Sequence, residues 1–528
     1  MKPMEMIYQV KIKDMDPMKD KEIKEKIANA IADAIKEYQT SVEYDPHNMS
    51  LMTDFYELTM GQVNFTNGEK DVKEYYDEFF RKEPFGAGYG VVAGLDQIIH
   101  YIEHLHFTDE DIEYLRSQNK FTEEYLNYLR HFEFTGDIYA IPDGQVVFRN
   151  EPIVTVVAPT IECKIIETAL LAITNGHVAY ATSTRKSVNA AGGIPKEGGI
   201  PIMEFGARRA RGLHAACDAS KTACMAGCVG TSNVKAAKDY GLIPMGTMAH
   251  SAVMESNSEY EAFQKYARSF PDKPLFLVDT YDTLNSGIPN AIQVCIDEGI
   301  DLGGIRIDSG DLAYLSKEAR KMMSEKFPDS KICVSNGLNA ESIESLKLQG
   351  AQIDSIGEGD HLSCPIGNVG AVYKNAAVEK EGKVIPKIKL SENDIKTTNP
   401  GYKKIYRFYD KATGYALGDV IAMADEIIPE DVYTFVSDKE PWKKKTITNF
   451  EVREVQVPVF KNGHLVYQDP TIKEKIEFCE ANMQSLYPEV KRTVKPHEYI
   501  VDLSKGEKAL KDNMREDIKV KKLGAYHE

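Results

Sequence analysis

Three arginines lie close together at Arg208, Arg209 and Arg211, in the segment EFGARRARG. Guanidinium groups bind phosphate and carboxylate oxygens through paired hydrogen bonds, so this density predicts a turn that binds an anionic ligand. A solvated basic turn that pairs with nearby carboxylates is the alternative. Because the turn follows a short apolar run and precedes small residues that must pack tightly, we favour the anion site.

Acidic residues follow two other apolar runs. VDTYDT holds Asp279 and Asp282, and RIDSGDL holds Asp308 and Asp311. Carboxylates near an arginine cluster would bind a divalent cation and the hydroxyls of a phosphorylated sugar. Helix capping is the alternative, because Ser and Asp are favoured N-cap residues. We expect Asp308 to contact a ligand and Asp311 to act at least partly as a cap.

The segment GTMAHSAVM places Thr247 and His250 at the start of a predicted helix. A lone histidine in such a place is more often a polar cap than a reactive group. If His250 were phosphorylated, a charge of about −1.5 to −2 would be added at the positive end of a helix dipole. The spacing leaves both interpretations open.

Two glycine-containing loops follow the last predicted strands. SNGLN runs from Ser335 to Asn339, and GEGD runs from Gly357 to Asp360. Their backbone N–H groups could approach a phosphate, and this end of a βα barrel commonly binds one. Each loop taken alone is weak support for a phosphate site.

The elements that must position these residues alternate in type. Short apolar strands are predicted to end at IMEFG, IPMGT, LFLVDT, GIRIDSG, KICVSN and IDSIGEG, and amphipathic segments such as 316–327 and 340–350 separate them. This alternation predicts parallel βα units, and six in a row favour a barrel or partial barrel. Catalytic side chains of such a fold lie at the carboxyl ends of its strands, where all the residues above are placed.

The flanking regions differ from this pattern. Residues 1–48 are predicted to be an N-terminal helical extension with an apolar stripe over 19–37, and a second helix is expected over 51–60. Residues 137–161 alternate apolar and polar, as an antiparallel sheet would. We therefore expect an α/β protein with four parts: the extension (1–48), a β-rich domain (49–165 and 370–440), a catalytic βα barrel (166–369) and a C-terminal appendage (441–528).

Composition excludes several classes of function. The chain has 528 residues and a formal charge of −17, which disfavours general binding to nucleic acid. The longest uncharged stretch, 168–184, is polar and too short to cross a membrane, and the charged N-terminus lacks a signal sequence. We expect a cytoplasmic protein with reduced cysteines. The group His214, Cys217, Cys224 and Cys228 fits no familiar zinc spacing, and its small neighbours indicate a packed helix.

Nine segments, in order from about residue 51 to residue 410, resemble the nicotinate phosphoribosyltransferases. They are LMTDFYELTM, RKEPFGAGYGVVAGL, FTGDIYAIPDGQVVFRNEP, EFGARRARG, GTSN, GTMAHS, LVDTYDT, GIRIDSGDL and LSENDIKTTNPGYKKIYR. The resemblance implies an irregular α/β barrel packed on a smaller β-rich domain. It also implies an enzyme of NAD biosynthesis that joins nicotinate to phosphoribosyl pyrophosphate, with Mg²⁺, and couples this to ATP hydrolysis through a phosphohistidine. A homodimer with shared sites is implied as well.

The resemblance also implies a role for each matching residue. His250 would be phosphorylated, Arg208 would hold phosphate, and Asp308 would act in catalysis at the ribose and the metal, with Asp279 as a second metal ligand. The pyridine ring would lie between Phe205 and Tyr56, with Tyr56 supplied in cis or in trans. Further substrate contacts are implied for Asp54, Ser232, Thr247 and Arg306. The phosphate loops would comprise Ser335, Asn336, Gly337, Gly357 and Gly359.

One position bears on the choice of substrate. The similar nicotinamide enzymes have an Asp where this chain has Ser232, and an Asp would repel a substrate carboxylate. We therefore favour nicotinate over nicotinamide, the alternative substrate, by one or two powers of ten. A catalytically silent binding relative is the other alternative. Two departures, Asp360 where Thr is common and Gly337 where Asp is common, put the phosphate contacts of those loops in question.

Overall fold

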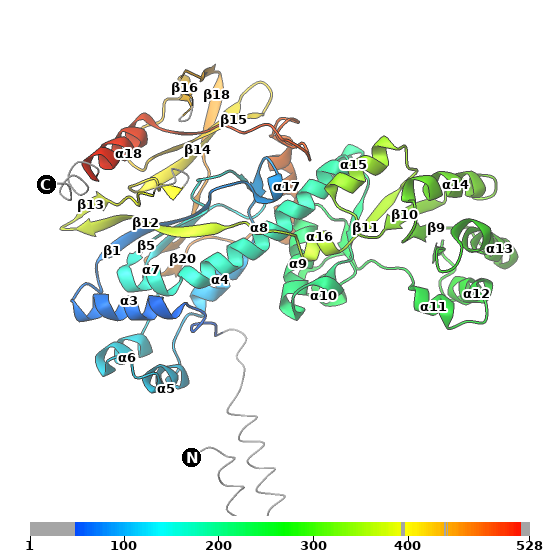
Figure 1. Cartoon of the computed structure of the whole chain (residues 1–528), viewed down its shortest axis with the longest axis horizontal. Coiled ribbons are helices and arrows are strands. Elements are labelled where there is room, and N and C mark those ends of the chain that lie inside the picture. The colour runs from blue at the N-terminus through cyan, green and yellow to red at the C-terminus, as the bar shows by residue number, and fades with distance from the viewer. Residues whose placement is uncertain (1–47, 392–395, 438–439, 441, 519–528) are drawn as a thin grey trace, which may run out of the picture.

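The computed structural model describes residues 48–391, 396–437, 440 and 442–518 (Figure 1). The helix predicted over 19–37 lies outside these residues. An α/β fold with one parallel sheet and several antiparallel ones is observed, which confirms the predicted class.

The largest sheet is antiparallel and draws its strands from distant parts of the chain. Its order is β13 (Lys383–Pro386), β12 (Ala371–Lys380), β1 (Lys73–Phe80), β5 (Val154–Pro159), β3 (Asp137–Ala140), β19 (Val457–Lys461) and β20 (His464–Leu465). β3 and β5 confirm the alternating pattern over 137–161, and β4 (Val146–Val147) between them pairs with β2 (Gly90–Val91).

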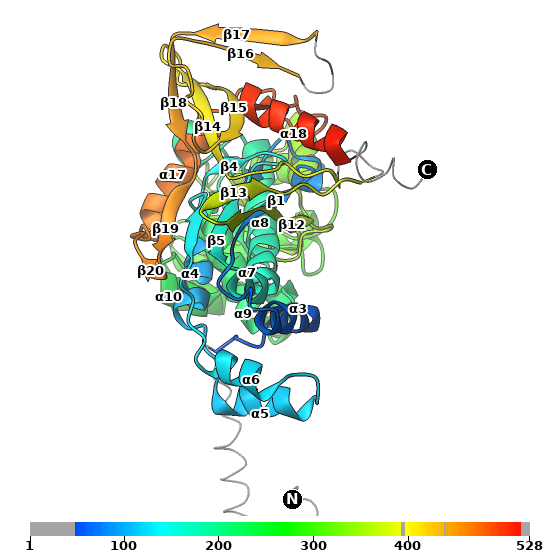
Figure 2. The same cartoon turned by 90° about the vertical axis from the view of Figure 1, so that its left-hand side faces the viewer.

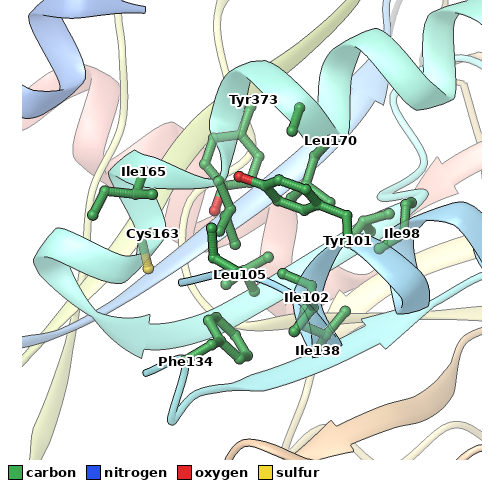
Figure 3. Close-up of a cluster of buried hydrophobic side chains, with 14 of the residues drawn as sticks. Ile98, Tyr101, Ile102, Leu105, Phe134, Ile138, Cys163, Ile165, Leu170 and Tyr373 are labelled. Atoms are coloured by element: carbon green, nitrogen blue, oxygen red, sulfur yellow. The ribbon is translucent and has the colours of Figure 1, made fainter. Parts of the chain in front are cut away.

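Helices pack against this sheet with regularly spaced apolar residues. They are α3 (Phe55–Thr66), α4 (Leu95–Glu103), α5 (Asp109–Ser117), α6 (Glu123–Arg130), α7 (Thr160–Ile165) and the 24-residue α8 (Glu167–Ala190). On α4, Ile98, Tyr101 and Ile102 are buried at spacings of three and four, which places them on one face. Figure 3 shows this face meeting Ile138 of β3 and Tyr373 of β12 in a single apolar core.

The second sheet is parallel throughout. Its order is β7 (Gly230–Thr231), β6 (Ile202–Glu204), β11 (Ser355–Glu358), β10 (Lys331–Ser335), β9 (Gly304–Ile307) and β8 (Leu275–Leu277). Five of the six predicted strands are present. The sixth, over 243–247, forms only a bridge between Thr231 and Pro244, in which the Thr231 N–H donates to the Ile243 carbonyl and the Met245 N–H donates to the Thr231 carbonyl. In the described residues no pairing joins the edge strands β7 and β8, so the sheet forms an open arc.

Helices connect these parallel strands and lie around them in Figure 1. They are α9 (Leu213–Met225), α10 (Val234–Tyr240), α11 (His250–Met254), α12 (Glu259–Ser269), α13 (Ile288–Glu298), α14 (Leu312–Ser324), α15 (Ala340–Leu348) and α16 (Asp360–Ser363). α8 lies between the two sheets, contacting β12 on one side and α15 and α16 on the other. Among the described residues, none of the helices is both long and apolar enough to traverse a bilayer.

The remaining strands complete the β-rich half. A third sheet has the order β18 (Phe450–Glu454), β14 (Lys403–Asp410), β15 (Ala416–Met423) and β21 (Val501–Leu503). The ribbon of β16 (Val432–Val436) and β17 (Lys444–Thr448) extends beyond it in Figure 2. Helices α17 (Ile472–Gln484) and α18 (Lys505–Ile518) follow. The four-part division of the chain remains a proposal. The predicted C-terminal appendage contributes strands to earlier parts of the chain, since β18 pairs with β14, β21 pairs with β15, and β19 pairs with β3.

Candidate active site

The candidate site lies at the carboxyl edge of the parallel sheet. Phe205 follows β6, Asp279 lies just after β8, Asp308 follows β9, and Ser335 ends β10. Parallel strands end at the same edge, so residues separated by as many as 130 positions meet there. Phe205, His250, Arg306 and Asp308, which the sequence predicts to share one pocket, are linked by the contacts that follow.

The ring of Phe205 lies over β11. A Cβ at Gly357 would come within 2.5 Å of Phe205 Cδ2, so only glycine leaves room for the ring. The Phe205 N–H donates to the Glu358 carbonyl at 2.7 Å, which ties the end of β6 to β11. The guanidinium carbon of Arg306 lies 5.3 Å from the Phe205 ring centroid. An aromatic face and a cation are therefore side by side, as a planar anionic ligand would require.

Arg306, Asp308 and Ser335 form a closed hydrogen-bonded triangle. Arg306 Nη2 donates to Asp308 Oδ1 at 2.9 Å, and Arg306 Nε donates to Ser335 Oγ at 2.8 Å. The Ser335 hydroxyl donates in turn to Asp308 Oδ1. Ser335 is 3 % exposed, so this bond is shielded from water. Both charged side chains are held in fixed orientations at the edge of the site.

His250 is the first residue of α11 and reaches the same cluster. Its Nε2 lies 3.8 Å from Asp308 Oδ2, and its Nδ1 lies 3.1 Å from Thr280 Oγ1. The His250 side chain is 41 % exposed, which leaves it accessible to a second substrate. Thr280, which the sequence reasoning missed, is signalled only by its place directly after Asp279. Both of these groups, Asp308 and Thr280, come from the ends of other strands.

Two polar atoms of the site are buried without a hydrogen-bond partner among the described residues. They are Asp279 Oδ1 and Thr247 Oγ1. The other oxygen of Asp279 accepts from the Asp308 N–H at 3.0 Å and from Ser309 Oγ at 2.5 Å. Buried polar groups are nearly always paired, so these two atoms indicate places where a ligand completes the site.

The residues fit a magnesium site in which substrate supplies most of the oxygens. No group of three or more His, Cys, Asp or Glu side chains that could hold a metal occurs within the described part of the chain. Mg²⁺ characteristically takes one or two protein carboxylates together with phosphate oxygens and water. Asp279 and Asp308 could supply those carboxylates.

The basic turn is exposed beside the pocket. Arg208, Arg209 and Arg211 are all exposed, and Arg209 Nε lies 3.1 Å from Asp360 Oδ1. The carboxylate of Asp360, a departure from the family pattern, is therefore paired with a cation. Asp311 caps α14 by accepting from the Tyr314 N–H at 3.0 Å, as predicted.

The phosphate loops have the backbone shape that glycine permits. Asn336 has φ 105° and Gly337 has φ 56°, so the chain turns through two successive left-handed residues directly after β10. Glycine adopts this conformation without strain, which accounts for Gly337. Both residues are exposed towards the site edge, and Gly359 lies between β11 and the first residue of α16.

Glu204 is a buried residue of this region that sequence reasoning missed. Its carboxylate accepts from Ser220 Oγ at 2.9 Å, from Thr231 Oγ1 at 2.5 Å and from the Gly206 N–H. It thereby fixes the turns that carry Phe205 and Ser232, and Ser232 itself is exposed. Its only sequence signal is a charged residue within an apolar strand.

Asp54 and Tyr56 are not at this edge of the same chain. Both belong to the start of α3, which packs on α6 and α7 and lies at the far side of the molecule from β9 and α11 in Figure 1. Met52, Phe55, Tyr56 and Val63 are exposed on or beside α3, Tyr56 at 49 %. A chain on its own therefore lacks the second aromatic side chain that the resemblance implies.

The cysteines that follow the basic turn lie in or after the packed helix α9, as their small neighbours predict. All eight cysteines of the chain are free, and Cys224 and Cys228 are buried among alanines in or after α9. Burial raises the pKa of Cys224 to about 12, so it stays a neutral thiol. Burial likewise raises the pKa of Glu358, on β11 behind the site, to about 8.

Comparison with protein families covers most of the chain. Residues 51–175 match the nicotinate phosphoribosyltransferase N-terminal domain, residues 200–404 match the nicotinate phosphoribosyltransferase family, and residues 402–511 match the C-terminal domain of the same enzymes. All the candidate site residues fall within the first two matches.

Individual relatives agree with this result. The chain is 42 % identical over 470 residues to the nicotinate phosphoribosyltransferase of Bacillus subtilis, covering 87 % of this chain and 93 % of the relative. The crystal structure of human nicotinic acid phosphoribosyltransferase is similar with a TM-score of 0.74 at 25 % identity, covering 88 % and 99 % of the two chains. A nicotinate-nucleotide pyrophosphorylase from Pyrococcus furiosus has the same fold, with a TM-score of 0.64 at 20 % identity and coverage of 84 % and 97 %.

Proposed function

The chain belongs to the nicotinate phosphoribosyltransferase family, and we propose that its site couples the family's reaction to ATP through His250. It is an enzyme of NAD salvage that joins nicotinate to phosphoribosyl pyrophosphate, giving nicotinate mononucleotide and pyrophosphate. The observation that carries the assignment of the site is the linked cluster of Phe205, Arg306, Asp308 and His250 at one strand edge.

The reaction requires no general acid or base. The pyridine nitrogen attacks ribose C1′, a C–N bond forms, and the C1′–O bond to pyrophosphate breaks with its electron pair leaving on that anion. Positive charge develops at C1′, so the site must align the reactants and stabilise the departing anion. This requirement is consistent with a cluster that lacks a base-activated nucleophile.

The pyridine ring would lie on Phe205 with its carboxylate towards Arg306. Offset stacking on an aromatic ring contributes roughly 0.5–1.5 kcal/mol beyond burial. Thr247 has a buried, unpartnered hydroxyl that would bind the same ligand, and Ser232 would donate to a carboxylate where an Asp would repel it. These contacts support nicotinate as the substrate.

The phosphoribosyl pyrophosphate would occupy the acidic and glycine-containing half of the site. Arg208 would bind its phosphates, as would the main chain of Ser335, Asn336, Gly337, Gly357 and Gly359. Asp308 would face the ribose, and Asp279 has a buried unpartnered oxygen that suits a metal ligand. A bound Mg²⁺ would supply charge neutralisation of the pyrophosphate.

ATP would act by phosphorylating His250. The Nδ1 atom is already engaged with Thr280, and the exposed ring lies beside Asp308, where a phosphoryl group would change the local charge. The added negative charge would repel the pyrophosphate product and change the order of the loops that bind it. Weaker binding of this product would favour turnover in the synthetic direction.

A homodimer would complete the site. Tyr56 is exposed on α3, which lies far from β6 and Phe205 of its own chain, and Phe55, Met60 and Val63 are exposed on the same helix. We propose that α3 of one protomer covers the site of its partner and brings Tyr56 and Asp54 to the pyridine ring. We also propose a cytoplasmic location, which agrees with the acidic composition.

One assay tests the proposal. Mononucleotide formation from nicotinate and phosphoribosyl pyrophosphate is measured with and without ATP for the wild-type chain, for His250→Ala and for the control His131→Ala. His131 is an exposed histidine on the other half of the molecule. ATP should stimulate the wild type and the control, while His250→Ala should keep basal turnover and lose the stimulation.

Other outcomes of this assay would contradict the proposal. Unchanged ATP stimulation of His250→Ala would exclude its phosphorylation as the coupling step. Preferred turnover of nicotinamide at equal concentration would overturn the choice of substrate, and no product from either pyridine would indicate a silent relative.

A further inference from the structure

One buried hydroxyl links the two charged side chains of the pyridine half of the site. Ser335 Oγ accepts from Arg306 Nε at 2.8 Å and donates to Asp308 Oδ1. A serine hydroxyl has one donor and two acceptor positions, and the donor is used here. The group sits at the end of β10 and is 3 % exposed, so water cannot readily replace either contact.

The two charged residues depend on Ser335 to different degrees. The described contacts of Asp308 also include Arg306 Nη2 at 2.9 Å, and its N–H donates to Asp279 at 3.0 Å. Arg306 Nε, in contrast, has Ser335 as its one hydrogen-bond acceptor within the described residues. Removal of the hydroxyl would therefore leave Asp308 anchored, but would leave Arg306 held through Nη2 alone, so that its guanidinium plane could turn about that one remaining contact.

The orientation that Ser335 imposes leaves useful donors on Arg306. A guanidinium has five N–H groups, of which one goes to Ser335 and one to Asp308. Three remain, and two of them form the planar fork that binds a carboxylate in a bidentate manner. The guanidinium carbon is 5.3 Å from the Phe205 ring centroid, so the fork is held beside the ring on which a pyridine would stack.

The neighbouring strand explains why the ring can lie so close. Ser335 pairs with Gly357 across β10 and β11, and an added Cβ at Gly357 would meet both Phe205 and Ser335 Cβ, at 2.5 Å and 3.3 Å from their nearest atoms. Phe205, Gly357, Ser335 and Arg306 are thus consecutive neighbours across the sheet edge. Ser335 is the member that connects the aromatic surface to the cation.

We propose that Ser335 is a positioning residue that holds the Arg306 fork towards the substrate carboxylate, and that it thereby sets the selectivity for a pyridine acid over its amide. This inference rests on the proposed function of the site. It gives the Ser335 side chain a role in pyridine selection rather than in binding phosphate.

The two roles predict different kinetic changes in Ser335→Ala. If Ser335 positions Arg306, kcat/KM for nicotinate falls about 10- to 100-fold, the range expected for loss of a hydrogen bond to a charged group. The KM for phosphoribosyl pyrophosphate and kcat stay within about threefold of wild type, and kcat/KM for nicotinamide changes less than that for nicotinate. A phosphate-binding hydroxyl would instead raise the KM for phosphoribosyl pyrophosphate.

Ser330→Ala is the matched control. Ser330 lies beside the other end of β10, is 1 % exposed, and donates to the Leu302 carbonyl at 3.0 Å. Both variants lose one buried serine hydroxyl near the same strand, and only one of them is at the site. A thermal unfolding curve of each variant shows whether they are folded and comparably stabilised.

A second variant keeps the test valid if Ser335→Ala does not fold. Ser335→Cys keeps nearly the same shape and replaces the hydroxyl with a weak hydrogen-bonding thiol. We expect the same direction of change as in Ser335→Ala, with no change in Ser330→Ala. Unaltered acid-to-amide selectivity in folded Ser335→Ala or Ser335→Cys would overturn the inference, as would a rise confined to the KM for phosphoribosyl pyrophosphate. An inactive wild type would instead reject the proposed function itself.

Discussion

Asp360 places a carboxylate beside the loop that we propose to bind phosphate. An unpaired anion there would repel a phosphorylated substrate, yet Arg209 Nε lies 3.1 Å away. Both side chains are more than half exposed, so the pair contributes little to stability. Its effect is on the local charge: Asp360 cancels one of the three arginines of the basic turn.

Asp360→Asn should therefore improve binding of phosphoribosyl pyrophosphate. We expect its KM to fall about two- to fivefold at low salt and the gain to shrink as salt screens the charges. The measurement is a KM titration at two ionic strengths. Asp329→Asn makes the same charge change at the opposite end of β10 and should leave KM unaltered. A raised KM in Asp360→Asn would mean that the carboxylate serves the substrate directly.

At the scale of single elements, strand ends were predictable and side-chain partnerships were not. Apolar runs followed by Asp279 or Asp308 predicted both the strands and their parallel arrangement. The run over 243–247 has an equally strand-like pattern, but it forms only one bridge, and Gly230–Thr231 is the edge strand of the sheet. Two-residue strands carry too little pattern to be predicted from periodicity.

The side-chain contacts of the site depend on the order of the strands in the sheet, and this order cannot be predicted from the sequence pattern. Ser335 looked like part of a phosphate loop, and only the pairing of β9 with β10 places its hydroxyl on Arg306 and Asp308. Thr280 and Glu204 were missed for the same reason, since their partners lie 30 and 27 residues away. In the proposed dimer, the position of Tyr56 relative to Phe205 depends on a second chain.

The packing of β11 on α8 makes stability depend on pH. Glu358 is fully buried, with Oε1 accepting from Ser187 Oγ at 2.9 Å and Oε2 unpartnered among the described residues. Burial raises its pKa from 4.5 to about 8, so the folded chain retains a proton that the unfolded chain releases. Folding stability should therefore fall as pH rises from about 4.5 to about 8 and level off above that value.

Glu358→Gln removes this titration. The wild type should lose stability as the pH rises, and the variant should not. The unfolding free energy of the variant minus that of wild type should therefore increase by on the order of 3 kcal/mol from pH 5 to pH 9. Urea unfolding at four pH values measures this slope, with Glu325→Gln, an exposed position, as the control. Parallel pH curves for wild type and Glu358→Gln would show that Glu358 does not titrate in this range.

At the scale of the whole molecule, the proposed shared site makes a distinctive prediction. Tyr56→Ala and Phe205→Ala should each be nearly inactive, because each removes one side of the pyridine pocket. Co-expressed at equal levels, they should regain about a quarter of wild-type activity, since half of the random dimers are mixed and each mixed dimer has one intact site.

The control is the same assay on each variant alone. Recovery in the mixture requires that Tyr56 and Phe205 of one site come from different protomers. Activity that stays at the level of the single variants, in a mixture shown to contain mixed dimers, would place Tyr56 in its own chain's site and contradict the proposed assembly.

The order of the antiparallel sheet has a consequence for biosynthesis. β3 receives its second neighbour, β19, from a segment made about 300 residues later. At roughly 5–20 residues per second, a ribosome would need on the order of 15–60 s to deliver it. During that time the nascent chain presents an unpaired strand edge, a site where misassembly begins. Newly made chains should therefore be prone to aggregation, and in need of chaperones, until β19 has left the ribosome.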